Sequence, residues 1–581
     1  MSNIFQKTEQ EIHDYLHKQV DLFDGIKYSE WKLKRRIALF QNHIYPNGKT
    51  DKQKRYKYWS DIIQPRVDDE VKNLRVDSDN FKIDSDNPEE DFGAVVVVNA
   101  RRKQFLINNG YAESFKEDVE DFSATGNLLW KKVGKKWERC DLVNTYLTNV
   151  RARTVNDTDV IERHQYTQSQ LRSKEEAGWK NIDNVINDLG DRQFAAVVDG
   201  EKTETSNPYY EIFERNGEVS EEEYMEAMNA YNGVKKGKKG DRDKFIMAKI
   251  IFAGLQKGAK DGKYVLYCGP IKNMNEVYQE AHRGAYKGKW MREGLVELLF
   301  DHQIRINEIT NQLARGLEWA SKTFFRSADK MLFQNLLTDI DSGSVLKSAD
   351  LQQVLTRMEG FDQLIKDYER IIREADRIAH SFEIVRGEEL KAGTPFRLGQ
   401  LMDQNVSKIY TVLRQKLTIG YKRIFKEWIL PELVGDLTRQ DVIALTGDHD
   451  FLEHMYRVIA KSWLTKNLAF IGPLAANPEF REMIIEEKVI ELSGQDVRIK
   501  LADKGKWKEI LGRLNLSITG ENSDMDEAME DLSNFIQVEQ RPGVRNYLLD
   551  RAYKLRGLSI PKSALEEDSQ LGSAPRLQQQ P

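Results

Sequence analysis

Residues 293–322 read EGLVELLFDHQIRINEITNQLARGLEWASK, and this stretch decides the architecture that we expect. Its apolar residues recur at helical spacing on one stripe: Leu295, Leu299, Ile306, Ile309, Leu313 and Leu317. The opposite face carries charged and amide side chains: Asp301, Arg305, Glu308, Gln312 and Arg315. About 30 residues at about 1.5 Å each predict roughly 45 Å of straight helix.

A second amphipathic helix is predicted over residues 361–380, after the helical pattern breaks at residues 324–356. Its apolar stripe consists of Leu364, Ile365, Tyr368, Ile371, Ile372, Ala375 and Ile378. Its other face is dense in charges of both signs: Asp362, Lys366, Asp367, Arg370, Arg373, Glu374 and Arg377. Two helices of mixed charge are therefore expected on either side of a short insertion.

A loop at residues 381–394 leads into a much longer predicted helix. Thr394 suits the N-cap and Pro395 suits the first helical position. We expect this helix to end just before Pro431, with kinks at its internal glycines, Gly399 and Gly420. Its length of about 36 residues, roughly 54 Å, far exceeds the globular average and indicates a beam in a large assembly.

The rest of the chain is predicted to mix helices and strands without regular alternation, which indicates an α+β architecture. Helix is expected over residues 5–75 and 93–121, with a solvated acidic loop between them at residues 77–91. Strands are expected at residues 127–133, 137–142, 146–154, 160–167, 209–215, 244–252 and 263–268. Beyond the long helix we expect a strand at residues 495–501 and then helices within residues 505–556.

Composition excludes several classes of protein. Of the 581 residues, 40% are hydrophobic, which is enough for a core and excludes wholesale disorder. Lys and Arg total 88 against 93 Asp and Glu, and the net charge of −5 excludes a basic, histone-like DNA binder. The two cysteines, Cys140 and Cys268, exclude a disulfide scaffold and a thiolate zinc site. No apolar run is long enough to predict a membrane-spanning helix.

The usual catalytic motifs are missing from the sequence. Gly48-Lys49-Thr50 matches the end of a P-loop, but His43 stands where its first glycine must be. The basic glycine loop at residues 233–240 lacks the required spacing, and His13 with His17 has no third metal ligand placed by spacing. We therefore predict no enzyme, with no catalytic residue, no metal site and no cofactor.

The order of helix, insertion, helix, loop and long helix resembles the portal protein, the head-to-tail connector of tailed double-stranded DNA bacteriophages. Local runs resemble that family too. TGNLLWKKV at residues 125–133 is similar to the β-rich start of its wing, and VIERHQYT at residues 160–167 to the strand that follows. Residues 293–300 resemble its first stem helix, and residues 387–396 its tunnel loop. The resemblance covers most of residues 90–435 and concerns the order of elements.

The resemblance implies a helix-rich portal fold in which wing, stem, clip and crown form one subunit. The wing would comprise residues 1–292 and 395–504, and the stem helices residues 293–324 and 357–380. Between and beyond them would lie a clip at residues 325–356, a tunnel loop at 381–394, crown helices at 505–561 and a disordered tail at 562–581.

The resemblance further implies a ring of twelve subunits at one capsid vertex, with a channel for packaging and ejecting the genome. The implied partners are other copies of the chain, double-stranded DNA, the terminase large subunit, the major capsid protein and neck or adaptor tail proteins, with no membrane. The implied location is the virion, after assembly in the host cytoplasm. Twelve copies would carry roughly −60, which suits a channel through which DNA must slide.

Three sets of residues take roles through this resemblance. The channel loop would present Glu383, Arg386, Glu388, Glu389 and Lys391, and the clip would meet the motor through Arg326, Lys330, Asp339 and Asp341. The stem interface between subunits would use Arg305, Glu308, Arg315, Lys366, Asp367, Arg370 and Arg373. Arg386 and Lys391 would touch phosphates only transiently, because each lasting contact adds affinity that slows DNA. Ordinary solvated charges are the alternative interpretation for each of these residues.

Two other functions remain open from the sequence. One is another oligomeric structural protein of the virion neck or head, for which the observed order of elements would not be expected. The other is a metal-dependent nucleic-acid enzyme, which needs a compact group of carboxylates on strands. The sequence does not display such a group.

Overall fold

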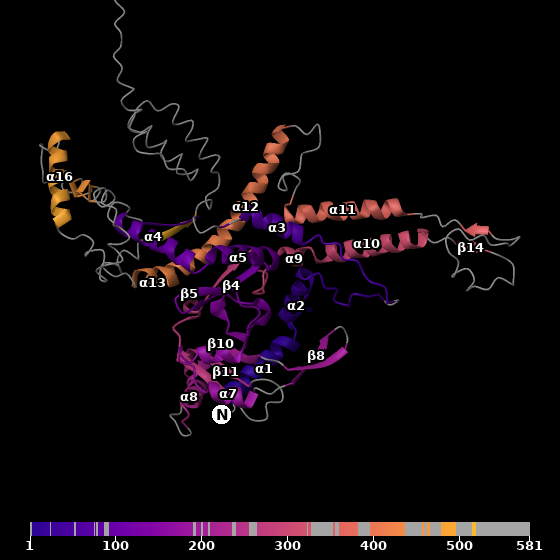
Figure 1. The fold of residues 1–581 in the computed structure, drawn as a ribbon, viewed down its shortest axis with the longest axis horizontal. Helices are drawn as coiled ribbons and strands as arrows, with labels where there is room; N and C mark the ends of the chain where they lie inside the picture. Colours follow the sequence, from indigo (N-terminus) through magenta and orange to yellow (C-terminus); the bar gives the residue numbers. More distant parts are fainter. Residues whose placement is uncertain are drawn as a thin grey trace, which may run out of the picture. The chain divides into compact units, whose positions relative to one another are not determined.

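The computed structural model shows a chain that mixes helices and strands and is richer in helix, as predicted. The chain forms two compact units, each built from two stretches (Figure 1). The first unit is Met1–Arg75 with Glu113–Asp403, and the second is Val76–Ala112 with Gln404–Pro581. The structure describes residues 3–23, 25–51, 54–74, 76, 80–85, 92–189, 193–198, 201–206, 209–234, 240–254, 264–321, 324–326, 352–354, 360–381, 396–435, 456–457, 460–461, 463–464, 478–494 and 514–518.

The first 75 residues are less helical than predicted. A β-hairpin interrupts the expected helix, because the Asp24-Gly25 dipeptide favours a tight turn and Gly25 adopts a positive φ of 83°. Ser29 then caps the next helix by accepting a hydrogen bond from the Lys32 amide. The elements are α1 (Asn3–His17), β1 (Val20–Phe23), β2 (Ile26–Tyr28), α2 (Glu30–Gln41) and α3 (Gln64–Leu74).

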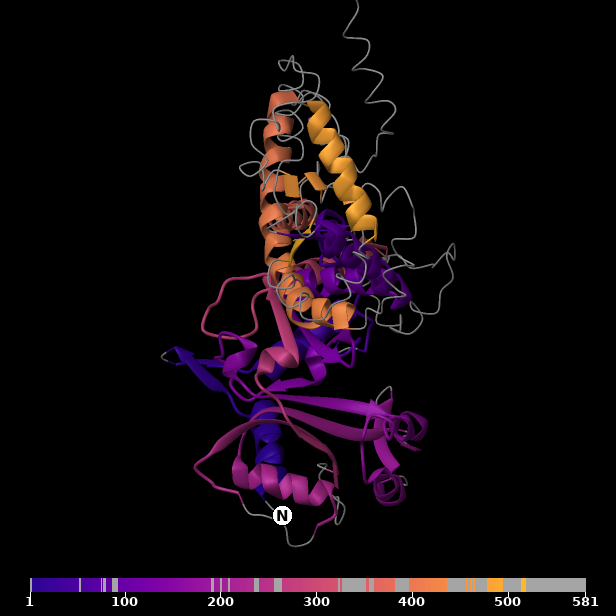
Figure 2. The ribbon, with the colours of Figure 1, turned by 90° about the vertical axis from the view of Figure 1, so that its left-hand side faces the viewer.

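A five-stranded antiparallel sheet in the order β12-β11-β10-β7-β6 forms the lower part of the first unit (Figure 2). Successive residues along its strands point to opposite faces of the sheet. Phe213 and Phe252 pack with α1 and α8, whereas Ile212 and Ile251 pack with α6 and α7. The strands are β6 (Thr145–Leu147), β7 (Val160–Tyr166), β10 (Tyr210–Ser220), β11 (Phe245–Ala253) and β12 (Tyr264–Pro270). The helices are α6 (Gln168–Ser173), α7 (Ile182–Leu189) and α8 (Glu221–Tyr231).

A three-stranded sheet connects the N-terminal part of the first unit to its long helices. Gly126, before β4, and Gly294, before α9, cross so closely that a Cβ on Gly126 would lie 2.5 Å from the Gly294 nitrogen. This close crossing of the two segments needs glycine at both positions. The elements are α5 (Tyr111–Thr125), β4 (Asn127–Val133), β5 (Lys136–Arg139) and β13 (Tyr278–His282). Smaller elements are η2 (Leu142–Asn144), η3 (Val155–Asp157), η4 (Met274–Glu276), β8 (Gln193–Val198) and β9 (Glu201–Ser206).

Two helices pack antiparallel and project from the first unit (Figure 1). The predicted helix at residues 293–322 is broken at Leu299 into α9 (Leu295–Leu298) and α10 (Phe300–Ser321). The second predicted helix is confirmed as α11 (Phe361–Ala379). Within the intervening insertion, the described residues form an antiparallel strand pair, β14 (Phe324–Arg326) and β15 (Gln352–Val354).

The second unit contains a strand where we predicted a solvated acidic loop. β3 (Phe81–Ser85) pairs antiparallel with β16 (Leu514–Ile518), and its Phe81 and Ile83 are fully buried. The prediction of a loop is therefore wrong for β3, because its two apolar residues alternate toward a core. The prediction of helix within residues 505–556 is likewise wrong for β16, whereas the strand expected at residues 495–501 lies outside the described residues.

The long helix continues through the proline that we expected to end it. α12 (Phe396–Ile424) passes into a π-helix (Phe425–Ile429) and then α13 (Leu430–Gly435). Pro431 follows directly after the π turn, and this widened turn accommodates a residue that lacks an N–H and whose ring crowds the preceding turn. Gly399 and Gly420 lie inside the continuous α12, so the irregularity falls at the π turn instead.

Phe81 packs against this irregular region of the second unit. Its ring centroid lies 5.3 Å from that of Tyr421 and 5.3 Å from that of Phe425, the first residue of the π turn. The remaining described helices include α4 (Phe92–Asn108) and α16 (Pro478–Gly494). No helix in the described part of the chain is long and apolar enough to cross a membrane.

Candidate interaction surface of the helical pair

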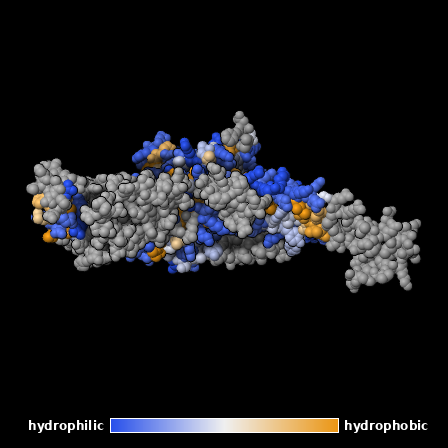
Figure 3. Space-filling model, turned by 90° about the horizontal axis from the view of Figure 1, so that it is seen from above, coloured by the Kyte–Doolittle hydropathy of each residue, from blue (hydrophilic) through white to orange (hydrophobic). Residues whose placement is uncertain are grey.

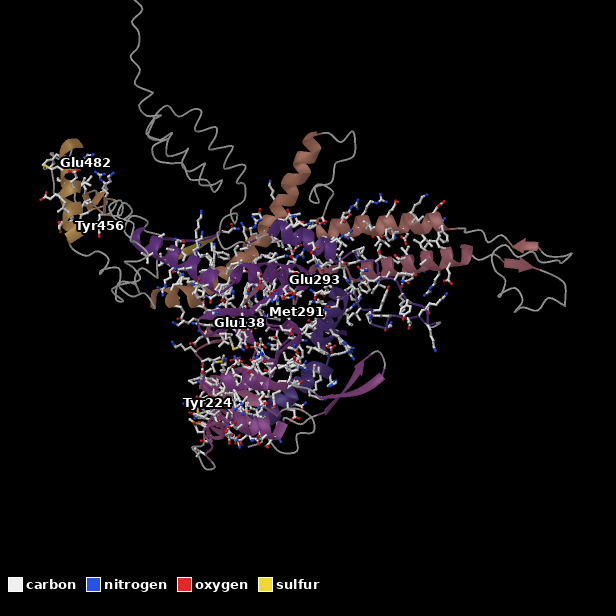
Figure 4. The ribbon with its side chains drawn as sticks, viewed as in Figure 1. Glu138, Tyr224, Met291, Glu293, Tyr456 and Glu482 are labelled. Atoms are coloured by element: carbon white, nitrogen blue, oxygen red, sulfur yellow. The ribbon has the colours of Figure 1, made fainter. Side chains whose placement is uncertain are left out.

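The α10–α11 pair carries all the residues predicted for a subunit interface, so it is the candidate functional surface. Side chains project from both helices of the pair (Figure 4). Its apolar stripe is buried toward the body of the unit, where Ile306 and Ile309 have no exposed surface. Toward the far end the stripe reaches solvent: Leu317 is 61% exposed and Ile365 45%. Hydrophobic surface is visible there in Figure 3. These exposed apolar side chains on a projecting helix pair are available for a contact with another surface.

Several of the predicted interface charges pair within the chain. The Arg305 guanidinium lies 3.1 Å from Asp367 and 3.2 Å from Glu308. Arg370 lies 2.7 Å from Asp367, and this hydrogen bond, with that from Arg305, lowers the pKa of the Asp367 carboxyl. These contacts join α10 to α11 on their exposed side, where ion pairs contribute little to stability.

The other interface candidates are not part of this pairing. Arg315 lies 2.8 Å from Asp51, and Arg373 donates to the backbone carbonyl of Glu369 over 3.3 Å. Lys366 is exposed and has no ion pair within the described residues. Lys366 and Arg373 are therefore the members of the predicted set that remain available to a second molecule.

A ladder of buried amide side chains holds α10 to an extended segment, and our reading of the sequence missed it. Gln303, Asn307 and Asn311 accept hydrogen bonds of 2.9–3.0 Å from the backbone amides of residues 62, 60 and 58, respectively. Gln303 and Asn311 also donate to the carbonyls of residues 60 and 58. Four helical residues rise about 6 Å and two extended residues about 6.6 Å, so the two repeats match. The i, i+4, i+8 spacing of the amides was the available signal.

A groove of about 950 Å³ lies between α2, residues 45–59 and α10. Its apolar floor includes Leu39, Phe40, Trp59 and Ile304. Its walls are rich in basic side chains: Lys32, Arg35, Arg36, Lys57 and Arg315. The residues come from three separated segments, so periodicity along the chain could not reveal the groove.

A buried polar cluster between the two sheets is the other candidate site. Glu162, His164 and Glu214 offer ligand atoms close enough together to hold a metal ion, beside a cavity of about 510 Å³. However, the Lys131 ammonium lies 2.7 Å from both carboxylates, and Lys249 lies 2.9 Å from Glu214. The two ammonium groups already neutralise the two carboxylates, which makes a dication unfavourable there.

The protonation states in this cluster agree with an internal ion network. Burial acts to raise the pKa of Glu214, but the charges of Lys131 and Lys249 outweigh it and lower that pKa. Burial lowers the pKa of His164, whose Nε2 is buried without a hydrogen-bond partner. The Tyr278 hydroxyl donates to Glu162, and Asn216 donates to Glu214 over 2.8 Å. We interpret the cluster as structural.

The predicted channel loop and most of the predicted clip lie outside the described residues. This applies to Glu383, Arg386, Glu388, Glu389 and Lys391 of the loop, and to Lys330, Asp339 and Asp341 of the clip. Arg326 lies in β14, opposite Gln352 of β15. These roles therefore stay predictions.

Comparison with known proteins adds no relative. No protein-family model matches the chain, and no curated protein matches it significantly. Any functional argument therefore depends on the residues and geometry described above.

Proposed function

We propose that this chain is a portal protein of a tailed double-stranded DNA bacteriophage, one subunit of a twelve-membered ring through which the genome is packaged and ejected. The observation that supports this proposal is the projecting antiparallel pair α10–α11, closed at its far end by an insertion and followed by the long helix α12. A pair with exposed apolar and mixed-charge faces suits a repeated contact between neighbouring copies.

The attachment of the pair to its unit supports this role. Arg66 lies 2.7 Å from Asp376 of α11, and both residues are buried. Arg283 makes a two-pronged ion pair, at 2.8 and 2.9 Å, with Glu70 of α3. The same helix α3 carries Arg66 and packs against α11. Together with the amide ladder, these contacts restrict the angle at which the pair leaves the unit. Head-to-tail contacts close into a ring only when that rotation is defined.

The proposal also specifies where each partner would bind relative to the ring. Duplex DNA would pass along the ring axis, the terminase large subunit and later the neck proteins would meet the insertion between α10 and α11, and the major capsid protein would surround the ring. The near balance of 88 basic and 93 acidic residues suits a channel that must not grip its DNA.

Imaging and native mass measurement of the purified full-length chain test the proposal. Closed rings with a central hole wide enough for duplex DNA are the expected result. Monomers that cut DNA in the presence of magnesium would overturn it in favour of a nucleic-acid enzyme. Oligomers without a central hole would instead favour another structural component of the virion.

Replacing both Arg386 and Lys391 with alanine tests the proposed channel loop in rings that still assemble. If these side chains touch phosphates transiently, DNA retention in filled capsids should fall, with a smaller dependence on salt. Measurement of packaged DNA length and of leakage would show this. Unchanged packaging and retention would contradict the role of the loop, without affecting the ring.

A further inference from the structure

We propose that the groove beside α10 is one half of the contact between subunits, and that it seats the outer face of α11 from the neighbouring copy. This inference rests on the proposed ring and specifies its contact. The groove is defined by α2, residues 45–59 and α10, and the outer face of α11 by Asp362, Ile365 and Glu369.

The groove presents positive charge that the described part of the chain does not neutralise. Lys32 and Arg35 are exposed on its wall, and neither forms an ion pair within the described residues. The nearest carboxylate to Arg36, that of Asp301, is 3.9 Å away. By contrast, the adjacent Lys34 is buried 2.8 Å from Glu30. An occupant of the groove should therefore be acidic.

The floor of the groove shows that its occupant must also be apolar. Arg36 lies over the ring of Phe40, with 5.6 Å between its guanidinium carbon and the ring centroid. Ile304 is 39% exposed beside Phe40 and Trp59. A nucleic-acid backbone would satisfy the basic wall but leave this floor uncovered. An amphipathic helix with acidic side chains around an aliphatic one satisfies both.

The outer face of α11 has this composition. Asp362, Ile365 and Glu369 are spaced i, i+3 and i+7, which places them within about 60° of one another around the helix axis. All three are exposed, and neither acid has an ion pair in the described part of the chain. The face extends for about 10 Å along the helix. Lys366 and Arg373 lie on the adjoining stripe of α11. In the proposed contact they face Glu308 on the α10 side of the neighbouring copy's groove.

The two surfaces lie on different sides of the pair, as a ring contact requires. α10 meets α11 through Arg305, whereas Ile304 and Arg315 line the groove on another face of the same helix. On α11, Asp367 turns to α10, and the outer face lies roughly opposite it by helical spacing. One copy can therefore receive α11 of the next while its own α11 enters the groove of the copy before. Such a heterologous contact repeats until the ring closes.

Reciprocal charge reversal in the full-length chain tests this contact. Lys32→Glu with Arg35→Glu, and separately Asp362→Lys with Glu369→Lys, should each convert rings to monomers, as measured by native mass. Combining all four substitutions should restore rings, because the charges of both surfaces are then reversed and the two surfaces attract each other again. Arg151→Glu with Arg172→Glu reverses two exposed charges elsewhere in the unit and should leave rings unchanged. Circular dichroism of every variant checks that the chain is folded.

Each other outcome has a defined meaning. Rings that survive both double reversals would overturn the proposed contact while leaving the ring itself established. Loss of rings without rescue by the combined variant would show that the two surfaces do not face each other, and would also overturn it. If the groove reversal abolishes binding of duplex DNA instead of ring formation, the groove is a nucleic-acid site. If the unmodified chain forms no rings, the proposed function fails, and this contact fails with it.

Discussion

The exposed ion pairs of the α10–α11 surface and the buried network around Lys131 use the same residue types for different purposes. On the helical pair, Arg305, Asp367 and Arg370 pair at the surface, where their side chains remain accessible to water and to another molecule. Between the sheets, Lys131, Glu162 and Glu214 are buried and hold each other in one arrangement. The difference teaches that burial, more than the identity of the charges, decides whether an ion pair stabilises a fold or serves recognition.

Removing the buried ammonium should have the largest effect. Lys131→Met leaves Glu162 and Glu214 buried with reduced compensation, which should cost about 3–5 kcal/mol of unfolding free energy. Urea denaturation measures this loss. Lys136→Met, at an exposed position of β5, serves as the control and should change little. Adding Glu162→Gln and Glu214→Gln to Lys131→Met should recover part of the loss, and the absence of any recovery would contradict an internal ion network.

A smaller effect is expected from the amide ladder. Asn307→Ala removes the acceptor of the partly buried Ser60 amide, which should cost about 1–3 kcal/mol. Hydrogen exchange at the Ser60 amide should accelerate in parallel. Asn307→Asp keeps an acceptor oxygen and should retain more of the protection. Equal exchange rates in all three proteins would show that this hydrogen bond does not hold the segment.

The buried cluster should also make stability depend on pH, whereas the exposed pairs should not in the same range. Burial lowers the pKa of His164 in the folded chain, so the unfolded chain binds more protons between that pKa and about 6.5. Stability should therefore fall as pH decreases through this window. His164→Asn should flatten the dependence of the unfolding midpoint on pH there, and an unchanged slope would assign it to another group.

The smallest effect is expected on the exposed surface. Arg305→Gln removes the pairs with Asp367 and Glu308, yet it should leave the unfolding midpoint of the monomer unchanged, because exposed pairs are screened and flexible. Thermal denaturation at low and high salt checks this. A large loss of stability would mean that the exposed pairs hold the helices together, and the contrast with Lys131 would disappear.

Much of the secondary structure could be predicted from the sequence where the pattern is long and regular. The α11 stripe and the strands β4, β7, β10 and β11 appear close to where their periodicity placed them. Prediction was poorest where a short apolar motif depended on a distant partner. Phe81 and Ile83 lie in an acidic stretch, and their burial depends on distant segments: β3 pairs with β16, more than 400 residues away, and Phe81 packs against Tyr421 and Phe425.

The same contrast holds for the candidate surface, of which one part could be predicted from the sequence and another part could not. The mixed charges of α10 and α11 could be read directly, since neighbouring turns of one helix carry them. The groove could not, because α2, residues 45–59 and α10 meet only after the amide ladder places the extended segment on α10. The buried partners of Lys131 likewise come from β7 and β10, and no local spacing relates them.

By itself, the sequence determined the amphipathic helices, the alternating strands and the mixed charge of the projecting pair, because each follows from side chains a few residues apart. Tertiary structure alone decided which apolar residues on those helices reach solvent, which charges are neutralised internally and where a groove opens. Those properties depend on distances between segments far apart in the chain, and only the packed fold sets such distances.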